Sequence, residues 1–203
     1  MAIKLIIGIG NPDEQYKDTR HNVGFMMLDY IVKKGDFPNE WEINKKLNTL
    51  TIKGKFEGSS VIVAKPQTYV NKTGESAAKL KNFYKVKPEQ ILVIQDDLDI
   101  PFGNTKISFD KNSGGHRGIE SVMKALKTKK FYRLRIGLAG RALAKTRLRV
   151  AEARSGEAKA RRQTAKRRDE FVMKFVLSKF SPSEHDEIKK IFKEGYEKIL
   201  QLS

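Results

Sequence analysis

Residues 3–12 read Ile-Lys-Leu-Ile-Ile-Gly-Ile-Gly-Asn-Pro, and the expected fold starts from this stretch. The isoleucine-rich run from Ile3 to Ile9 is typical of a buried strand, and the Gly-Asn-Pro that follows closes it with a turn. From His21 to Lys34 apolar side chains recur as in a largely buried helix that ends near Gly35. A strand followed by a helix predicts the first unit of an α/β fold.

The same alternation continues along the chain. Further strands are expected at residues 50–53, 60–65, 91–94, 105–109 and 133–138, with residues 54–59 as a loop between the first two. Further helices are expected after Asn71, from the glycine-rich loop 113–118 to about Leu126, and after Ser181-Pro182-Ser183-Glu184, which has the pattern of a capped helix start. The pattern predicts one three-layer α/β domain over residues 1–203, with a twisted mixed sheet flanked by helices.

Composition limits the class of protein. The chain has 203 residues, no cysteine and a net charge of +17, so disulfides and thiolate sites are excluded and a polyanion such as nucleic acid is the first candidate partner. A lysine-rich solubilising surface is the alternative explanation of the charge. The amino-terminal apolar run is too short for a signal peptide or a membrane span, so we expect a cytoplasmic protein without a membrane partner.

One segment does not suit a compact core. Residues 141–168 contain 11 lysines and arginines against 2 glutamates, a net charge of +9, and few large apolar side chains. We expect this basic insertion to form a projecting arm, with helix favoured by its composition. It serves either as an additional RNA contact or as a solvated excursion without a role here.

The chemistry depends on histidine and carboxylate. His21 and His116 lie in turns before helices, and a carboxylate such as Asp96 can fix the tautomer of a histidine that acts as a general base. A Gly-x-Ser-x-Gly turn is absent, so an activated water is favoured over a protein nucleophile. The turn at residues 8–13 lacks the third glycine of a dinucleotide-binding fingerprint, and the backbone freedom that a tight turn needs explains the glycines that it has.

Six motifs, in this order, resemble those of bacterial-type peptidyl-tRNA hydrolases. They are Gly8-Ile9-Gly10-Asn11-Pro12, Thr19-Arg20-His21-Asn22-Val23-Gly24-Phe25, Lys65-Pro66-Gln67-Thr68-Tyr69-Val70-Asn71, Gln95-Asp96-Asp97-Leu98-Asp99, Gly114-Gly115-His116 and Arg133-Leu134-Arg135-Ile136-Gly137. The resemblance implies an enzyme that cleaves the ester between peptide and tRNA by water attack, without a metal or other cofactor. It also implies a monomer whose partner is the acceptor end of peptidyl-tRNA.

The resemblance also implies roles for individual residues. His21 would be the catalytic base, Asp96 its orienting partner, and Asn11 a positioner of substrate and water. Contacts to the peptide and the tRNA end would come from Tyr16, Tyr69, Asn71, His116 and Arg117. Arg135 would bind tRNA phosphate together with a lysine; ungapped alignment places that lysine at Ser108, so Lys106 or Lys111 is the substitute, and we take Lys106.

The chain departs from the family pattern at three places. Asp13 stands where glycine is common, Arg117 stands where asparagine is common, and the basic insertion 141–168 replaces a short loop. Two other functions are also considered, one for the fold without its catalysis and one for the first glycine turn. A catalytically silent RNA-binding homologue would lack ester cleavage, and an enzyme with a nucleotide cofactor would bind a dinucleotide.

Overall fold

The central element is a mixed β-sheet. A computed structural model describes residues 2–38, 40–56, 58–140 and 158–202, and in these residues seven strands pair in the order β2-β3-β4-β1-β5-β7-β6. The strands β4, β1, β5 and β7 are parallel neighbours, and β2, β3 and β6 add to the two edges in antiparallel pairs. The strands are Leu5–Gly8 (β1), Glu42–Asn44 (β2), Thr49–Phe56 (β3), Ser59–Pro66 (β4), Ile91–Pro101 (β5), Thr105–Phe109 (β6) and Tyr132–Ala139 (β7).

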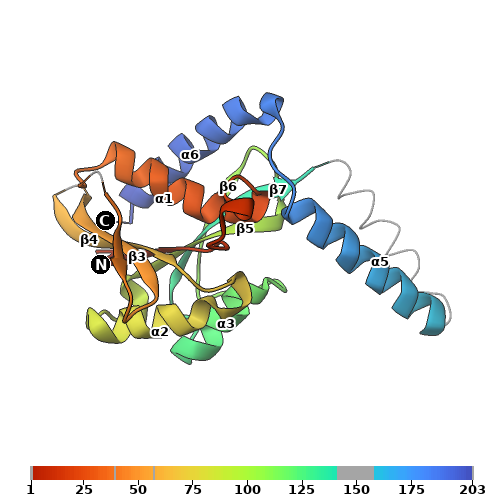
Figure 1. The fold of residues 1–203 in the computed structure, drawn as a ribbon, viewed down its shortest axis with the longest axis horizontal. Coiled ribbons are helices and arrows are strands. Elements are labelled where there is room, and N and C mark those ends of the chain that lie inside the picture. Colours follow the sequence, from red (N-terminus) through yellow and green to blue (C-terminus); the bar gives the residue numbers. More distant parts are fainter. Residues whose placement is uncertain (1, 39, 57, 141–157, 203) are drawn as a thin grey trace.

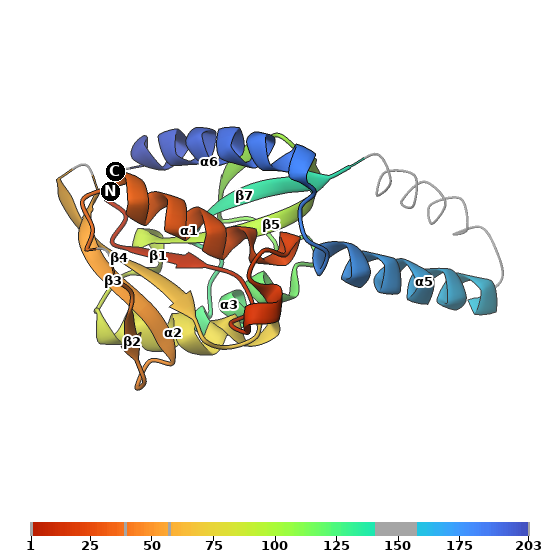
Figure 2. The same cartoon turned by 45° about the horizontal axis from the view of Figure 1, so that its top comes forward.

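Helices cover both faces of this sheet, as Figures 1 and 2 show. The helices α1 and α6 lie on one face, and α2 and α3 lie on the other. Their bounds are Val23–Lys34 (α1), Thr73–Phe83 (α2), Arg117–Leu126 (α3), Ala158–Val176 (α5) and His185–Leu200 (α6). The predicted α/β class with a mixed central sheet is therefore confirmed.

Alternation along the central strands divides the core into two layers. In β5, Leu92 and Ile94 pack toward α1 and α6, whereas Ile91 and Val93 pack toward α2 and α3. A strand that is buried on both faces has no polar face, which is why its sequence is a continuous apolar run.

The helix α5 extends away from the sheet, and its carboxyl-terminal end returns to the body beside the residues that precede α1 (Figures 1 and 2). Residues 158–168 of the predicted basic arm lie in the first part of this helix, and residues 141–157 lie outside the described residues. No helix of the described chain is long and apolar enough to cross a membrane.

Three local predictions were wrong. Residues 54–56 are not loop but continue β3, where Gly54 pairs with Val61, because the hairpin turn is shorter than the sequence suggested. The strand β5 does not end at Ile94 but runs to Pro101, because its backbone continues to pair with β7 through Asp97. The short edge strand β2, with Ile43 exposed, was not predicted.

The glycines of the first turn also have a different reason from the one expected. Gly8 and Gly10 lack the positive φ angles that favour glycine. A Cβ at Gly8 would lie 2.9 Å from the carbonyl oxygen of Gly24, and one at Gly10 would lie 2.8 Å from the Phe25 ring. Both glycines therefore allow α1 to approach β1 closely, which places the residues before α1 at the carboxyl edge of the sheet.

Candidate active site

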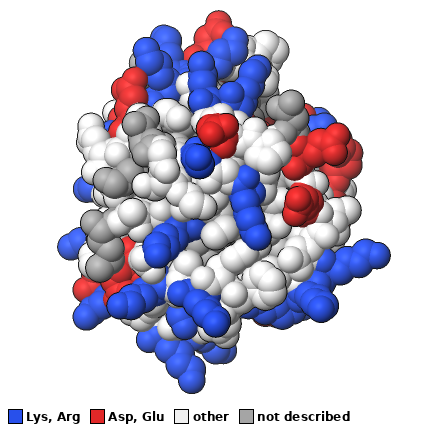
Figure 3. All heavy atoms as spheres, turned by 90° about the vertical axis from the view of Figure 1, so that its left-hand side faces the viewer, with Lys and Arg blue, Asp and Glu red and all other residues white. Residues whose placement is uncertain are grey.

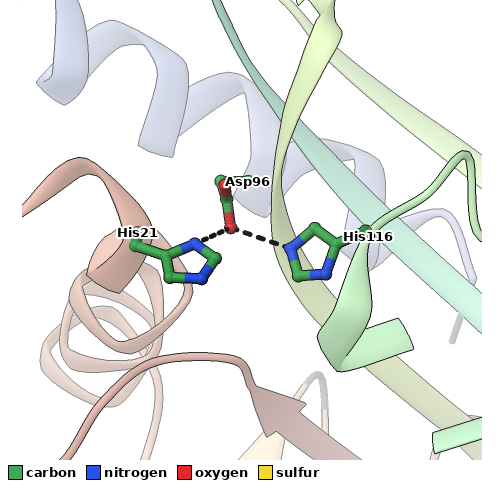
Figure 4. A group of neighbouring side chains, drawn as sticks. All are labelled: His21, Asp96 and His116. Atoms are coloured by element: carbon green, nitrogen blue, oxygen red, sulfur yellow. Dashed lines mark hydrogen bonds and ion pairs between the residues drawn. The ribbon is translucent and has the colours of Figure 1, made fainter. Parts of the chain in front are cut away.

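Two histidines contact one buried carboxylate at the carboxyl edge of the sheet (Figure 4). His21 Nδ1 lies 2.9 Å from Asp96 Oδ1, and His116 Nε2 lies 2.9 Å from the same oxygen. Asp96 belongs to β5 and is 2% exposed, whereas His21 lies in the 3₁₀ turn η2 (Arg20–Asn22) just before α1. Segments that are 20 to 75 residues apart in sequence thus meet at one atom.

The glycine-rich loop determines how His116 reaches this carboxylate. Gly114 and Gly115 have φ angles of +66° and +82°, which a residue with a Cβ adopts only with strain. The loop brings His116 to the N-cap of α3, where its Nδ1 accepts hydrogen bonds from the backbone N–H groups of Gly118 (3.1 Å) and Ile119 (3.4 Å). The ring is therefore held on both sides.

The partners assign the tautomer of each ring. Since His116 Nδ1 accepts from two N–H groups, the proton of the neutral ring is on Nε2, which donates to Asp96. His21 in turn donates from Nδ1 to Asp96, so the lone pair of its neutral ring is on Nε2. No hydrogen bond to this Nε2 comes from the part of the chain that the structure describes. His21 can therefore accept a proton from a water, whereas both nitrogens of His116 are engaged.

Electrostatics support a charged Asp96. Burial alone raises the pKa of this carboxyl, but the nearby His21 and His116 and their hydrogen bonds outweigh burial, and the net effect lowers the pKa of Asp96. For His21, burial lowers the pKa, whereas the charge of Asp96 and its hydrogen bond raise it, and the net pKa is raised. The carboxylate thus stays ionised and stabilises an imidazolium at position 21.

The same three side chains resemble a metal-binding set, because their ligand atoms lie within 4.8 Å of one another. A metal on His116 Nε2 would require the proton of the neutral ring on Nδ1, and that proton would point at the N–H groups of Gly118 and Ile119. Histidine ligands normally donate their second N–H to an acceptor. The hydrogen-bond donors around His116 therefore do not suit a metal.

A second polar cluster lies beside His21 and centres on Asn11. Asn22 Oδ1 accepts from the Asn11 N–H, and Asn22 Nδ2 donates to the Asn11 carbonyl, both at 2.9 Å. The side-chain oxygen of Asn11 accepts from the N–H of Val70 at 3.1 Å. This leaves the Asn11 amide group, Nδ2, as a neutral donor without a partner among the described residues. Sequence reasoning gave Asn22 no role, although it stands next to His21 in the second motif.

A pocket of 490 Å³ opens at the histidine pair. His21, His116, Arg117 and the acidic end of β5 line it, and a further wall is a stripe on α5 of Asp169, Val172, Met173 and Val176. The spacing of three and four residues places these four on one helix face. Sequence reasoning missed this wall, because nothing in the local pattern of α5 indicates which part of the body it contacts.

Other predicted site residues lie outside this pocket. Tyr69 donates to Asp13 Oδ2 at 2.8 Å and so ties the turn after β1 to the turn after β4; Tyr16, in η1 (Glu14–Tyr16), is half-buried. Asn71 is exposed in η3 (Val70–Lys72). The departure at position 13 thus has a partner, Tyr69.

Arg135 and Lys106 lie at the far edge of the sheet. Arg135 Nε donates to Asp97 Oδ2 at 2.7 Å, so this guanidinium is held by a carboxylate that sequence reasoning did not assign to it. Lys106 is exposed and stands directly opposite Arg135 in the β6–β7 pairing, whereas Ser108 stands opposite Arg133. Residues directly opposite in an antiparallel pair share one face of the sheet. Lys106 and Arg135 therefore lie side by side on one face of the sheet.

Arg20 connects the site to the carboxyl-terminal helices. Its guanidinium donates to Glu184 at 2.7 Å and to Ser178 at 3.3 Å, and lies 4.8 Å from the ring centres of Phe175 and Phe180. Glu184 Oε2 also accepts from the backbone N–H of Ser181 in the predicted capping box. The residue before His21 thus holds the end of α5 and the start of α6 together.

The comparisons with known proteins agree with this arrangement. The family model described as "Peptidyl-tRNA hydrolase" matches residues 5–152. A peptidyl-tRNA hydrolase from Aquifex aeolicus is 39% identical over 96% of this chain and 87% of its own length, and one from Lactobacillus johnsonii is 46% identical over 67% and 72%. The crystal structure of peptidyl-tRNA hydrolase from Acinetobacter baumannii is 28% identical, with a TM-score of 0.79 over 98% of this chain and 88% of that one. The chain therefore belongs to the peptidyl-tRNA hydrolase family of ester-cleaving enzymes.

Proposed function

We propose that this protein hydrolyses the ester between the peptide and the tRNA of peptidyl-tRNA, and that His21 is the base. The observation that carries the proposal is the pair of contacts at Asp96: the carboxylate accepts from both rings, and of the two histidines only His21, which lines the pocket, keeps a lone pair on its other nitrogen. Family membership supports the substrate, and the hydrogen bonds support the mechanism. We further propose that residues 1–203 act as one monomeric domain in the cytoplasm.

In the proposed reaction His21 Nε2 takes a proton from a water, whose oxygen attacks the ester carbonyl carbon. The carbonyl oxygen becomes an oxyanion, and the Asn11 amide is the proposed neutral donor to it. As the bond to the ribose oxygen breaks, the imidazolium returns its proton to that oxygen, giving a free carboxyl group and a ribose hydroxyl. A positioned base typically contributes about 10²- to 10⁴-fold in rate, and one oxyanion donor about 3 kcal/mol.

The remaining predicted contacts are proposed as substrate-binding groups. Tyr16, Tyr69, Asn71, His116 and Arg117 would meet the peptide and the terminal nucleotide. Lys106 and Arg135, which share one face at the edge of the sheet, would hold a tRNA phosphate.

The test replaces His21 by alanine and measures both cleavage of peptidyl-tRNA and tRNA affinity. We expect ester cleavage to fall by about 10²- to 10⁴-fold while tRNA affinity is kept. A matched control is His185→Ala, since His185 is exposed at the start of α6. Full activity in the His21 variant would refute the mechanism, and absence of cleavage by the unaltered protein would identify a silent RNA-binding homologue.

A further inference from the structure

We propose that the carboxyl-terminal end of α2, with the turn that follows it, is a second RNA-binding surface that takes a single-stranded segment. We call it the α2 surface and define it by Lys53, Lys79, Phe83, Tyr84, Lys85 and Lys87. Residues 79–87 read Lys-Leu-Lys-Asn-Phe-Tyr-Lys-Val-Lys, with four lysines and no acidic residue. The proposal concerns binding away from the active site and does not depend on the reaction there.

The exposed aromatic ring is the first observation. Phe83, in the last turn of α2, is 57% exposed. Leu80 and Val86, three residues before and after it, are only 0% and 5% exposed. Its ring meets Tyr84 edge-on, with ring centres 4.9 Å apart, so one ring supports the other and the outer ring is left open to solvent. An open aromatic face held in place can stack on a nucleobase.

The backbone that carries this ring is fixed by the end of the helix. Lys85 adopts a φ angle of +53°, and the Val86 N–H donates to the Lys81 carbonyl at 3.1 Å, which closes the helix end. The side chain of Val86 is buried in the core beside Leu80. Phe83 therefore lies on the solvent side of the helix end, because Leu80 and Val86 take the buried side.

The charge around the ring is the second observation. Lys53 Nζ lies 5.5 Å from the centre of the Tyr84 ring, and Lys79, Lys85 and Lys87 are exposed. Lys79 and Phe83 are four residues apart and so share one face of α2. In Figure 3 the charged side chains in the lower part of this side of the molecule, where Figure 1 places the end of α2, are mainly Lys and Arg. Lysines interleaved with aromatic rings suit a single strand, which offers phosphates and unpaired bases together.

The α2 surface is separate from the active site. The helix α2 begins just after Val70, whose N–H binds Asn11, and then runs away from the site for 11 residues, about 16 Å at 1.5 Å per residue. The turn after it leads to Gln90, which pairs with Lys4 at the beginning of β1. The surface therefore lies at the amino end of the parallel strands, and the histidine pair lies at the carboxyl end.

The experiment uses the full chain with a tryptophan reporter, Phe83→Trp, titrated with a ten-nucleotide oligo(U). Stacking on the indole should quench its fluorescence, and binding is followed in parallel by anisotropy of the labelled RNA. The matched control is Ile43→Trp, because Ile43 is 72% exposed on the edge strand β2 without this cluster. We expect saturable quenching in the first variant and none in the second. Both variants also contain the natural Trp41, so each titration is compared with that of the unaltered protein.

Two further variants complete the test. Adding Lys85→Glu and Lys87→Glu to the reporter should weaken the quenching titration by about 5- to 100-fold, whereas adding Lys190→Glu and Lys193→Glu, the same charge change at exposed positions of α6, should leave it within about twofold. The proposal is wrong if RNA binds without quenching at position 83, or if both charge changes weaken it equally. Equal binding of polyglutamate would also overturn it, since that would show a general polyanion surface.

Discussion

At the scale of single residues, function depends on which nitrogen of each imidazole carries the proton. His116 is tied by Gly118 and Ile119 on one side and by Asp96 on the other, so a proton added to it would face two N–H groups. His21 has only one of its nitrogens engaged in the described chain. The two histidines share one carboxylate but differ in chemistry because of the backbone around them.

This difference leads to a prediction for Asp96→Asn. The proposed base acts when His21 is neutral, so kcat/KM should fall as the pH drops through the pKa of His21. In the unaltered protein Asp96 raises that pKa, while burial opposes it. Without the carboxylate the burial effect remains, so the acid limb of a profile measured from pH 5 to 9 should move to lower pH, with the plateau lower by about 10²- to 10⁴-fold.

The control for this profile is Asp186→Asn, because Asp186 is an exposed carboxylate on α6 that pairs with Lys189. It removes the same charge at an exposed position outside the pocket of the two histidines and should leave the limb in place. An acid limb at the same pH in the Asp96 variant would mean that His21 is not the group that titrates.

At the scale of elements, the position of His21 depends on how closely α1 approaches the sheet. A Cβ at Gly24 would lie 2.5 Å from the carbonyl oxygen of Ile9 and 2.7 Å from that of Ile94, and backbone cannot move aside as a side chain can. Gly24→Ala should push α1 outward. We expect a loss of about 1–3 kcal/mol in the free energy of unfolding and a fall in kcat, measured by urea denaturation and by ester cleavage.

The matched substitution is Gly195→Ala in α6, which faces the same core. There the new Cβ would meet only the ends of the Leu134 and Met27 side chains, at 3.1 and 3.3 Å. Because alanine favours helix by about 1 kcal/mol over glycine, this variant should keep its stability and activity. If both variants behave alike, close packing at Gly24 is not what positions the site.

The ion pair of Arg20 and Glu184 joins η2 to the start of α6, and it gives a pH prediction. Burial raises the pKa of the Glu184 carboxyl, but hydrogen bonds from Arg20 and Ser181 outweigh burial and lower it to about 2. Because the pKa of this carboxyl is lower in the folded state, its ionised form stabilises the fold at pH values above the ordinary pKa of 4.5. This stability is lost as the pH falls from 4.5 toward 2. Glu184→Gln should therefore cost about 1.5–3 kcal/mol at pH 7 and progressively less below pH 4.5 in urea denaturation. A cost that stays constant down to pH 2.5 would contradict this assignment.

At the scale of the whole molecule, sequence patterns predicted those strands, helices and caps that depend on neighbouring residues in the chain. The buried strands β1 and β7, the helix α1 and the capping box before α6 have periodic or paired signals within a few residues. The continuation of β5 through Asp96 and Asp97 was missed, because acidic residues do not favour strands and only pairing with β7 holds them extended. The wall of the pocket on α5 and the hold of Asn22 on Asn11 depend on tertiary contacts, which no local pattern encodes.

Charge acts over the whole molecule, and the basic insertion supplies +9 of the net +17. We propose that part of this charge contacts tRNA phosphate, so replacing Arg147, Arg149 and Arg154 by glutamine should flatten the dependence of log affinity on log salt. Each lost phosphate contact removes about 0.7–0.9 from the slope, so three lower it by about 2–3. The matched variant replaces the exposed Lys189, Lys190 and Lys193 of α6 by glutamine and loses the same charge. If the insertion contacts phosphate, only the first variant lowers the slope by that amount; equal slopes in the two variants would show that the insertion acts through net charge alone.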